Sequence, residues 1–116
     1  MAEVTDSLRV VEQIPQVEAV QLVRKFLRIL KLQEIRVEAA YLYGSYATGV
    51  ADADSDIDVA IVSPSLSGDR LQDWMRLTTT ATDVDLRFEV VGFRPEQFRD
   101  ERPLAWEIKT RGILIQ

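Results

Sequence analysis

The spacing of apolar residues along the chain predicts an alternation of helices and short strands. Between about residues 15 and 32, apolar side chains recur every three or four positions, which predicts an amphipathic helix. A short apolar, aromatic-rich run at residues 37–43 predicts a buried strand that ends at Gly44. A second apolar run at residues 56–62 predicts the next strand, whereas residues 1–13 show no clear period.

The second half of the chain repeats this alternation. Helical spacing predicts a helix over about residues 69–80, and alternation at residues 85–91 predicts a strand with one charged face. The pattern then predicts a single helical turn, a last helix and a terminal strand, in that order, at residues 95–98, 104–110 and 112–115. Because no repeat or linker-like tract interrupts the 116 residues, we expect one domain over residues 1–116.

Composition restricts the chemistry available to this chain. It contains no cysteine and no histidine, so any metal site must rest on oxygen ligands. The formal net charge of −5 argues against direct, nonspecific nucleic acid binding, which requires a basic surface. A small anionic ligand that arrives with Mg²⁺ remains compatible with this charge.

The sequence contains neither a membrane-spanning segment nor a secretory signal that its pattern would reveal. No apolar run approaches the roughly 20 residues that cross a bilayer. The first residues also lack the basic and then apolar regions of a secretory signal. We therefore expect a cytoplasmic protein that does not contact membrane.

Two aspartates begin the second predicted strand. Because side chains alternate along a strand, Asp56 and Asp58 project to the same side, with Cα atoms about 6–7 Å apart. Their mutual repulsion is relieved when a cation binds, and Mg²⁺ prefers carboxylate, water and phosphate oxygens. The pair is therefore a candidate metal site.

A glycine turn precedes these aspartates. Gly44 permits a sharp turn at the end of the first predicted strand, and the amides that follow form the positive end of a short helix. The hydroxyl of Ser45 adds a further donor for phosphate oxygens. Gly44 and Ser45 are thus candidate phosphate-binding residues.

A third carboxylate would complete a site for two metal ions. The charged face of the third predicted strand offers Asp85 and Glu89. Arg87 lies between them, and it could contact phosphate or balance the two acids.

Two other interpretations of the acidic stretch are possible. Aspartates at every second position suggest a calcium loop, but an EF-hand that begins at Asp52 needs glycine at Ile57 and glutamate at Ser63. A solvated acidic turn is the other alternative. Asp52 and Asp54 fit that description themselves, but the glycine turn upstream favours a binding site at the later pair.

Residues 44–49, Gly-Ser-Tyr-Ala-Thr-Gly, are followed at residues 55–58 by Ser-Asp-Ile-Asp. Together they resemble the GSxxRG…SDxD signature of the polymerase-β-like nucleotidyltransferase superfamily, and the chain's size is similar to its minimal nucleotidyltransferase (MNT) group. The similarity covers nearly the whole chain. It implies an α+β, polymerase-β-like palm fold: a small mixed β-sheet with helices packed mainly on one face.

The resemblance also implies roles for individual residues. Asp56 and Asp58 correspond to the family's Mg²⁺ ligands, and Ser45 corresponds to the serine that holds the triphosphate. Relatives with a similar later strand carry a glutamate where Glu89 stands, which favours Glu89 over Asp85 as the third catalytic and metal-binding carboxylate. The family usually has arginine where this chain has Thr48, so a positive contact to phosphate is missing from the motif.

The function implied is Mg²⁺-dependent transfer of a nucleoside monophosphate, AMP from ATP, to a hydroxyl acceptor. Family members that modify small molecules carry a further helical domain, for which this chain has no room. MNT proteins of this kind are typically antitoxins paired with a HEPN-domain toxin, which some of them modify with AMP. The alternative is a weak or inactive binding module that neutralises such a toxin by occlusion.

Overall fold

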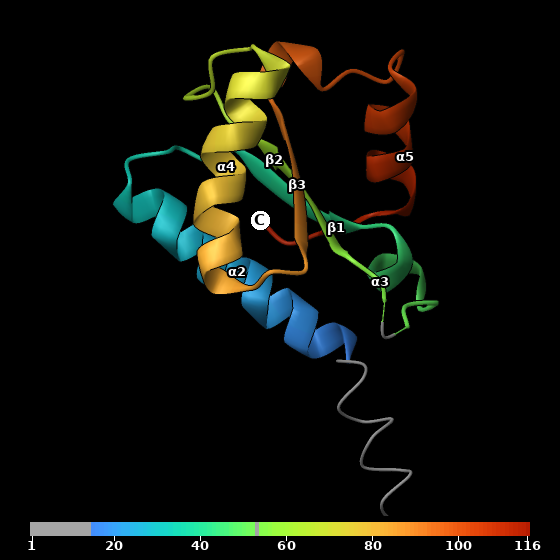
Figure 1. The fold of residues 1–116 in the computed structure, drawn as a ribbon. Helices are drawn as coiled ribbons and strands as arrows, with labels where there is room; N and C mark the ends of the chain where they lie inside the picture. Colours follow the sequence, from blue (N-terminus) through green and yellow to red (C-terminus); the bar gives the residue numbers. More distant parts are fainter. Residues whose placement is uncertain (1–14, 53) are drawn as a thin grey trace, which may run out of the picture.

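The computed structural model describes residues 15–52 and 54–116, so the interpretation of residues 1–13 lies outside the described part (Figure 1). Helices and strands alternate along the chain as the apolar pattern predicts. The order is α2 (Gln16–Leu32), β1 (Ala39–Tyr43), α3 (Ser45–Thr48), β2 (Ile57–Val62), α4 (Arg70–Val84), β3 (Phe88–Phe93), the 3₁₀ turn η1 (Pro95–Gln97), α5 (Pro103–Arg111) and β4 (Ile113–Leu114).

The strands form one mixed sheet in the order β3-β2-β1-β4. β1 pairs antiparallel with β2 and with β4, whereas β2 and β3 are parallel. Parallel neighbours need a long crossover, which α4 supplies between β2 and β3. β2 is therefore an interior strand whose two faces are both covered by protein.

The two faces of the sheet carry two hydrophobic clusters. Ile57, Val59 and Ile61 of β2 belong to the larger cluster, together with apolar residues of α2 and α4. Ala60 and Val62 point the other way and pack with residues of β3 and α5. The two long helices thus cover one face and the shorter α5 the other (Figure 1), which confirms the expected α+β fold.

No helix in residues 15–52 and 54–116 has both the length and the apolar character needed to cross a bilayer.

The third strand begins later than its charge alternation predicts. α4 continues to Val84, and Asp85 ends that helix, so the strand starts only at Phe88. The hydroxyls of Thr79 and Thr82 donate to carbonyls one turn earlier, and Ala81 is fully buried in the core. Tertiary packing therefore extends the helix through a threonine run whose β-branched side chains favour strands.

α4 buries a face that its apolar residues do not predict. Leu71 and Trp74 are 65% and 43% exposed, whereas Asp73 is only 2% exposed. The Asp73 carboxylate accepts hydrogen bonds from the Ser67 backbone N–H and hydroxyl, both at 2.8 Å, and from the Gly68 N–H at 3.0 Å. It stabilises the loop that leads from β2 into α4, and so fixes where the crossover begins.

We predict that Asp73→Ala destabilises the fold by about 2–4 kcal/mol, because the buried carboxylate and the three hydrogen bonds that it accepts are lost together. Urea unfolding followed by circular dichroism measures the change. Asp83→Ala is the matched control: Asp83 is exposed on the same helix, and its replacement should change stability by less than about 0.5 kcal/mol. Equal effects of the two substitutions would contradict this role for Asp73.

Candidate functional site

A single-residue turn joins β1 to α3. Gly44 has φ of +69°, a conformation that residues with a side chain rarely adopt. A Cβ atom built on Gly44 would lie 2.1 Å from Oδ2 of Asp58, far inside van der Waals contact. Glycine is therefore required here twice, by the backbone conformation and by the close approach of the aspartate.

The first amides of α3 are available to a ligand. The N–H groups of Ala47 and Thr48 donate to the Gly44 carbonyl, at 3.1 and 3.2 Å. Among the described residues, those of Ser45 and Tyr46 have no backbone acceptor. The Ser45 side chain is half-buried beside the exposed Gly44. Two amides and one hydroxyl thus lie together at the start of this short helix.

The remaining side chains of α3 stabilise the turn itself. Tyr46 is buried in the core, and its carbonyl accepts a hydrogen bond of 2.8 Å from the Gln16 amide of α2. The Thr48 hydroxyl donates back to the carbonyls of Gly44 and Ser45, at 3.3 and 3.4 Å. Thr48 therefore acts on the backbone of the turn and brings no positive charge to it.

Strand register brings three polar side chains into one row across the sheet. Asp58 of β2 is paired with Tyr43 of β1 on one side and with Glu89 of β3 on the other. Residues paired in register project from the same face of a sheet. That face is opposite to the one formed by Ile57 and Val59, so the row lies on the α5 side.

Asp56 and Asp85, the other two acids proposed from the sequence, lie outside the row formed by Tyr43, Asp58 and Glu89. Asp56 is exposed and directly precedes β2, which begins one residue later than predicted. Asp85 is engaged by Arg87, whose side-chain nitrogens donate to its two carboxylate oxygens at 2.9 and 2.8 Å. This ion pair holds the pKa of Asp85 below its usual range. Glu89, rather than Asp85, is thus the acid next to Asp58.

Negative charge accumulates around the row. Burial, followed by the charges of Asp56, Glu89 and Glu107, raises the pKa of Asp58 from 3.8 to about 6. Burial and the charges of Asp58, Glu89 and Glu107 raise the pKa of Tyr43 to about 12, so its hydroxyl stays protonated at neutral pH. A bound cation would relieve this repulsion.

Glu107 is a contributor that the sequence pattern did not single out. It lies on α5, which is packed over this face of the sheet, and its charge affects both Asp58 and Tyr43. Along the chain it is one charged residue among several on an exposed helical surface, so nothing in the spacing distinguishes it.

A cleft opens beside Glu89. Its volume is about 440 Å³, and its wall combines β3 with Tyr43, Arg70, Leu71 and Trp74. The Arg70 guanidinium carbon lies 5.5 Å from the centre of the Phe93 ring. The cleft thus offers apolar surface and the Arg70 cation next to Glu89. The Tyr43 hydroxyl and the Trp74 indole N–H are its two neutral hydrogen-bonding groups.

The arrangement fits an oxygen-liganded metal ion in part. Within residues 15–52 and 54–116, no three carboxylates already stand together as a complete ligand set. Mg²⁺, however, is usually held by only one or two carboxylates, with phosphate oxygens and water filling the other positions. Asp58, together with Glu89 beside it or Asp56 two residues before it, offers the one or two carboxylates of that mode of binding.

Comparison with known proteins identifies related folds. The family model described as polymerase beta, nucleotidyltransferase matches residues 24–116. A crystal structure of a nucleotidyltransferase candidate from Sulfolobus solfataricus is similar with a TM-score of 0.61 and 16% identity, over 85% of this chain and 80% of that one. No curated protein sequence gives a significant match.

Two toxin-antitoxin structures are also similar. One contains AMP-PNP and matches with a TM-score of 0.60 and 21% identity, over 84% of this chain and 72% of that chain. The other is a variant of MntA-HpeT in which two aspartates, two positions apart, are replaced by glutamate. It matches with a TM-score of 0.54 and 16% identity, over 89% of this chain and 73% of that chain.

The raised pKa of Asp58 predicts how stability depends on pH in the absence of divalent ions. Between pH 3.8 and about 6 the folded chain binds more protons than the unfolded chain, so the free energy of unfolding falls as the pH rises. Because Asp58 is half-exposed, we expect a fall on the order of 1 kcal/mol.

Asp58→Asn should abolish most of this fall, because the neutral amide does not titrate. Urea unfolding of both proteins at about pH 4 and about pH 7 measures it. Asp54→Asn, an exposed loop substitution, serves as the control and should behave as the wild type. An unchanged pH dependence in Asp58→Asn would show that this carboxyl does not carry the effect.

Proposed function

This chain belongs to the polymerase β nucleotidyltransferase family, and on that premise we propose that it transfers AMP from ATP to a hydroxyl group of a partner protein, with Mg²⁺. The carrying observation is the in-register pair of Asp58 and Glu89, in which Asp58 lies against the glycine turn. In that turn the N–H groups of Ser45 and Tyr46 have no backbone acceptor among the described residues. This arrangement supports a phosphate site and a cation site side by side.

The glycine turn is the proposed triphosphate site. The amides of Ser45 and Tyr46 and the hydroxyl of Ser45 are the donors for phosphate oxygens. Gly44 has no side chain, so the anion can approach the turn closely. Thr48 supplies no charge there, so neutralisation of the phosphates depends on the metal.

Asp56, Asp58 and Glu89 are the proposed metal ligands and catalytic carboxylates. When bound, Mg²⁺ supplies neutralisation of the phosphates and acidifies the acceptor hydroxyl. Glu89 is exposed at the wall of the cleft, where an acceptor can reach it. We propose that Glu89 also orients the acceptor hydroxyl for attack.

The transfer itself is a balanced displacement. The acceptor oxygen forms a bond to the α-phosphorus of ATP as the bond to pyrophosphate breaks. The proton of the hydroxyl passes to a carboxylate oxygen, for which Glu89 is the candidate, since the chain has no histidine. Pyrophosphate leaves with the charge of the broken bond.

The acceptor is proposed to be a toxin of the HEPN type, which makes this chain an antitoxin. Two similar structures are toxin-antitoxin assemblies, one of them with a nucleotide analogue. The two substituted aspartates of the other are spaced like Asp56 and Asp58. The resemblance to MNT proteins stated above supplies the HEPN class. A chain without cysteine is compatible with the reducing cytoplasm, where we propose that it acts.

A second candidate function is neutralisation by occlusion without transfer. It is favoured by Thr48, whose hydroxyl bonds to the turn and leaves the motif without its usual cation. Exposed apolar side chains on α4 and α5, Leu71, Trp74, Met75 and Trp106, offer surface for a stable complex.

Isothermal titration with ATP and Mg²⁺ separates the two functions. We expect measurable binding to the wild type and at least tenfold weaker binding to Asp56→Asn and Asp58→Asn, because each loses a charged metal ligand. Asp54→Asn is the control and should bind as the wild type. An absence of heat from a wild type that is folded by circular dichroism would exclude the enzymatic proposal.

The third carboxylate is tested by transfer to the co-purified partner. Intact mass should show a gain of one AMP, and Glu89→Gln should slow this gain by about a hundredfold or more. Asp85→Asn weakens contacts with Arg87 alone, the ion pair and the hydrogen bond from its backbone N–H, and should leave the rate nearly unchanged. The opposite result would assign the role to Asp85, and a stable, unmodified complex would favour occlusion.

A further inference from the structure

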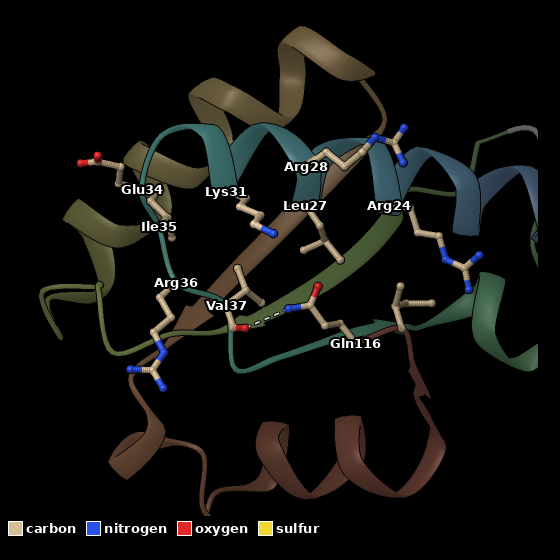
Figure 2. A pocket seen from close by; sticks show the side chains of 10 residues that line it. Arg24, Leu27, Arg28, Lys31, Glu34, Ile35, Arg36, Val37 and Gln116 are labelled. Carbon is tan, nitrogen blue, oxygen red and sulfur yellow. Dashed lines mark hydrogen bonds between the residues drawn. The ribbon is translucent and has the colours of Figure 1, made fainter.

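A groove lies between α2 and the segment that leads into β1. Arg24, Arg28 and Lys31 of α2 and Arg36 of the following loop line it, and its volume is about 800 Å³. Figure 2 shows Arg24 and Lys31 extending from α2 toward the opening, with Gln116 along its lower side, whereas the guanidinium groups of Arg28 and Arg36 point outward at its rim. We call this surface the basic groove.

The floor of the basic groove is apolar. Leu27 and Ile35 are buried beneath the cations, and Val37 and Ile115 are half-buried beside them. Aliphatic surface is thus within reach of the same ligand that meets the charges. No aromatic side chain is among the described residues that line the groove.

The loop that carries Arg36 is held in place by several hydrogen bonds. The Arg36 N–H donates to the Ser65 hydroxyl at 3.0 Å, and its carbonyl accepts from the Ser63 hydroxyl. The Gln116 side-chain amide donates to the Val37 carbonyl at 2.9 Å, which joins the two walls (Figure 2). The groove therefore has a defined shape before any ligand binds.

The charge of the groove contrasts with that of the chain. Four cations and Glu34 give its lining a net charge of +3, on a chain of −5. In Figure 2 the Glu34 carboxylate points away from the cations, and no described carboxylate forms a salt bridge with any of the four. The position of Lys31 can be explained by helix stability alone, because Lys31 lies in the last turn of α2 and its charge complements the helix dipole. Arg24 and Arg28 lie further from that end.

The groove is separate from the carboxylate site. Val37 lies at one end of the segment that includes β1, and Tyr43 lies at the other. Six residues of extended chain span about 20 Å. A ligand in the groove would leave the glycine turn and the aspartates open.

We propose that the basic groove is a docking site for an acidic amphipathic helix of a partner protein. Arg24, Arg28 and Lys31 recur at i, i+4 and i+7, which aligns them along about 10 Å of one helix face. Carboxylates with the same spacing on a second helix would meet them, while leucines between those carboxylates pack on the apolar floor.

Nucleic acid fits the groove less well. Single strands bind through aromatic stacking platforms, which the lining lacks, and the rest of the chain carries excess negative charge that repels phosphate. The docking proposal needs no catalysis, so it stands or falls separately from the transferase activity.

A labelled amphipathic peptide tests the proposal by fluorescence anisotropy with the whole chain. The probe carries glutamate at i, i+4 and i+7 with leucine between, and its control has glutamine in place of each glutamate. We expect the glutamate peptide to bind, to bind more weakly as salt rises, and to lose affinity about tenfold or more in Arg24→Glu/Arg28→Glu.

Three controls make the result decisive. Arg99→Glu/Arg102→Glu changes the net charge equally at another exposed site and should alter affinity less than about twofold. Thermal melts check that each variant is folded. If Arg24→Glu/Arg28→Glu does not fold, the neutral variant Arg24→Gln/Arg28→Gln is used in its place. Titration of the reversal variant with ATP and Mg²⁺ should match the wild type, and Asp58→Asn should bind the peptide normally, which separates this proposal from the transferase.

Three outcomes would overturn the proposal. They are equal binding of the glutamine peptide, equal loss of affinity in the control variant, and displacement of the peptide by a single-stranded RNA that binds more tightly and depends on Arg24 and Arg28. The last result would assign the groove to nucleic acid.

Discussion

The packing of Asp58 against Gly44 is the constraint on which the proposed site depends. The carboxylate occupies the space where any other residue at position 44 would have its Cβ atom, so the turn and the aspartate define each other's positions. Burial and three neighbouring acids make that carboxylate unfavourable when ionised, as its raised pKa indicates. A cation bound here would relieve this cost, and the transferase proposal assigns that role to the Mg²⁺ that accompanies the nucleotide.

The mixed sheet places two further polar side chains beside Asp58. Antiparallel pairing with β1 brings Tyr43 to one side of Asp58, and parallel pairing with β3 brings Glu89 to the other. A shift of either strand by one residue would move its side chain to the opposite face. Register is held by the apolar residues of β2, which are buried on both faces, so the hydrophobic core and the carboxylate row are specified together.

The two ends of the segment 37–43, which includes β1, carry surfaces of opposite charge. At the Tyr43 end lies the acidic row, with the cleft of about 440 Å³ beside it. At the Val37 end lies the basic groove, which is rimmed by Arg24, Arg28 and Arg36. A partner held at one end and presented to the other would combine the proposed docking and transfer, because docking would raise the effective concentration of the acceptor.

Much of the fold follows from local pattern, because apolar periodicity and the glycine turn report backbone conformation directly. The same pattern supplied Gly44, Ser45, Asp56 and Asp58, which lie close together in the sequence, in one turn and at the start of the next strand. The resemblance already favoured Glu89 over Asp85, but only the tertiary structure, through distant strand pairing, placed Glu89 beside Asp58 and Asp85 against Arg87 at a helix end. It also decided that α4 buries Asp73 and exposes Trp74, and that Arg36 joins the cations of α2. The physical reason is that strand register and helix facing are set by the whole core, which no local window of sequence contains.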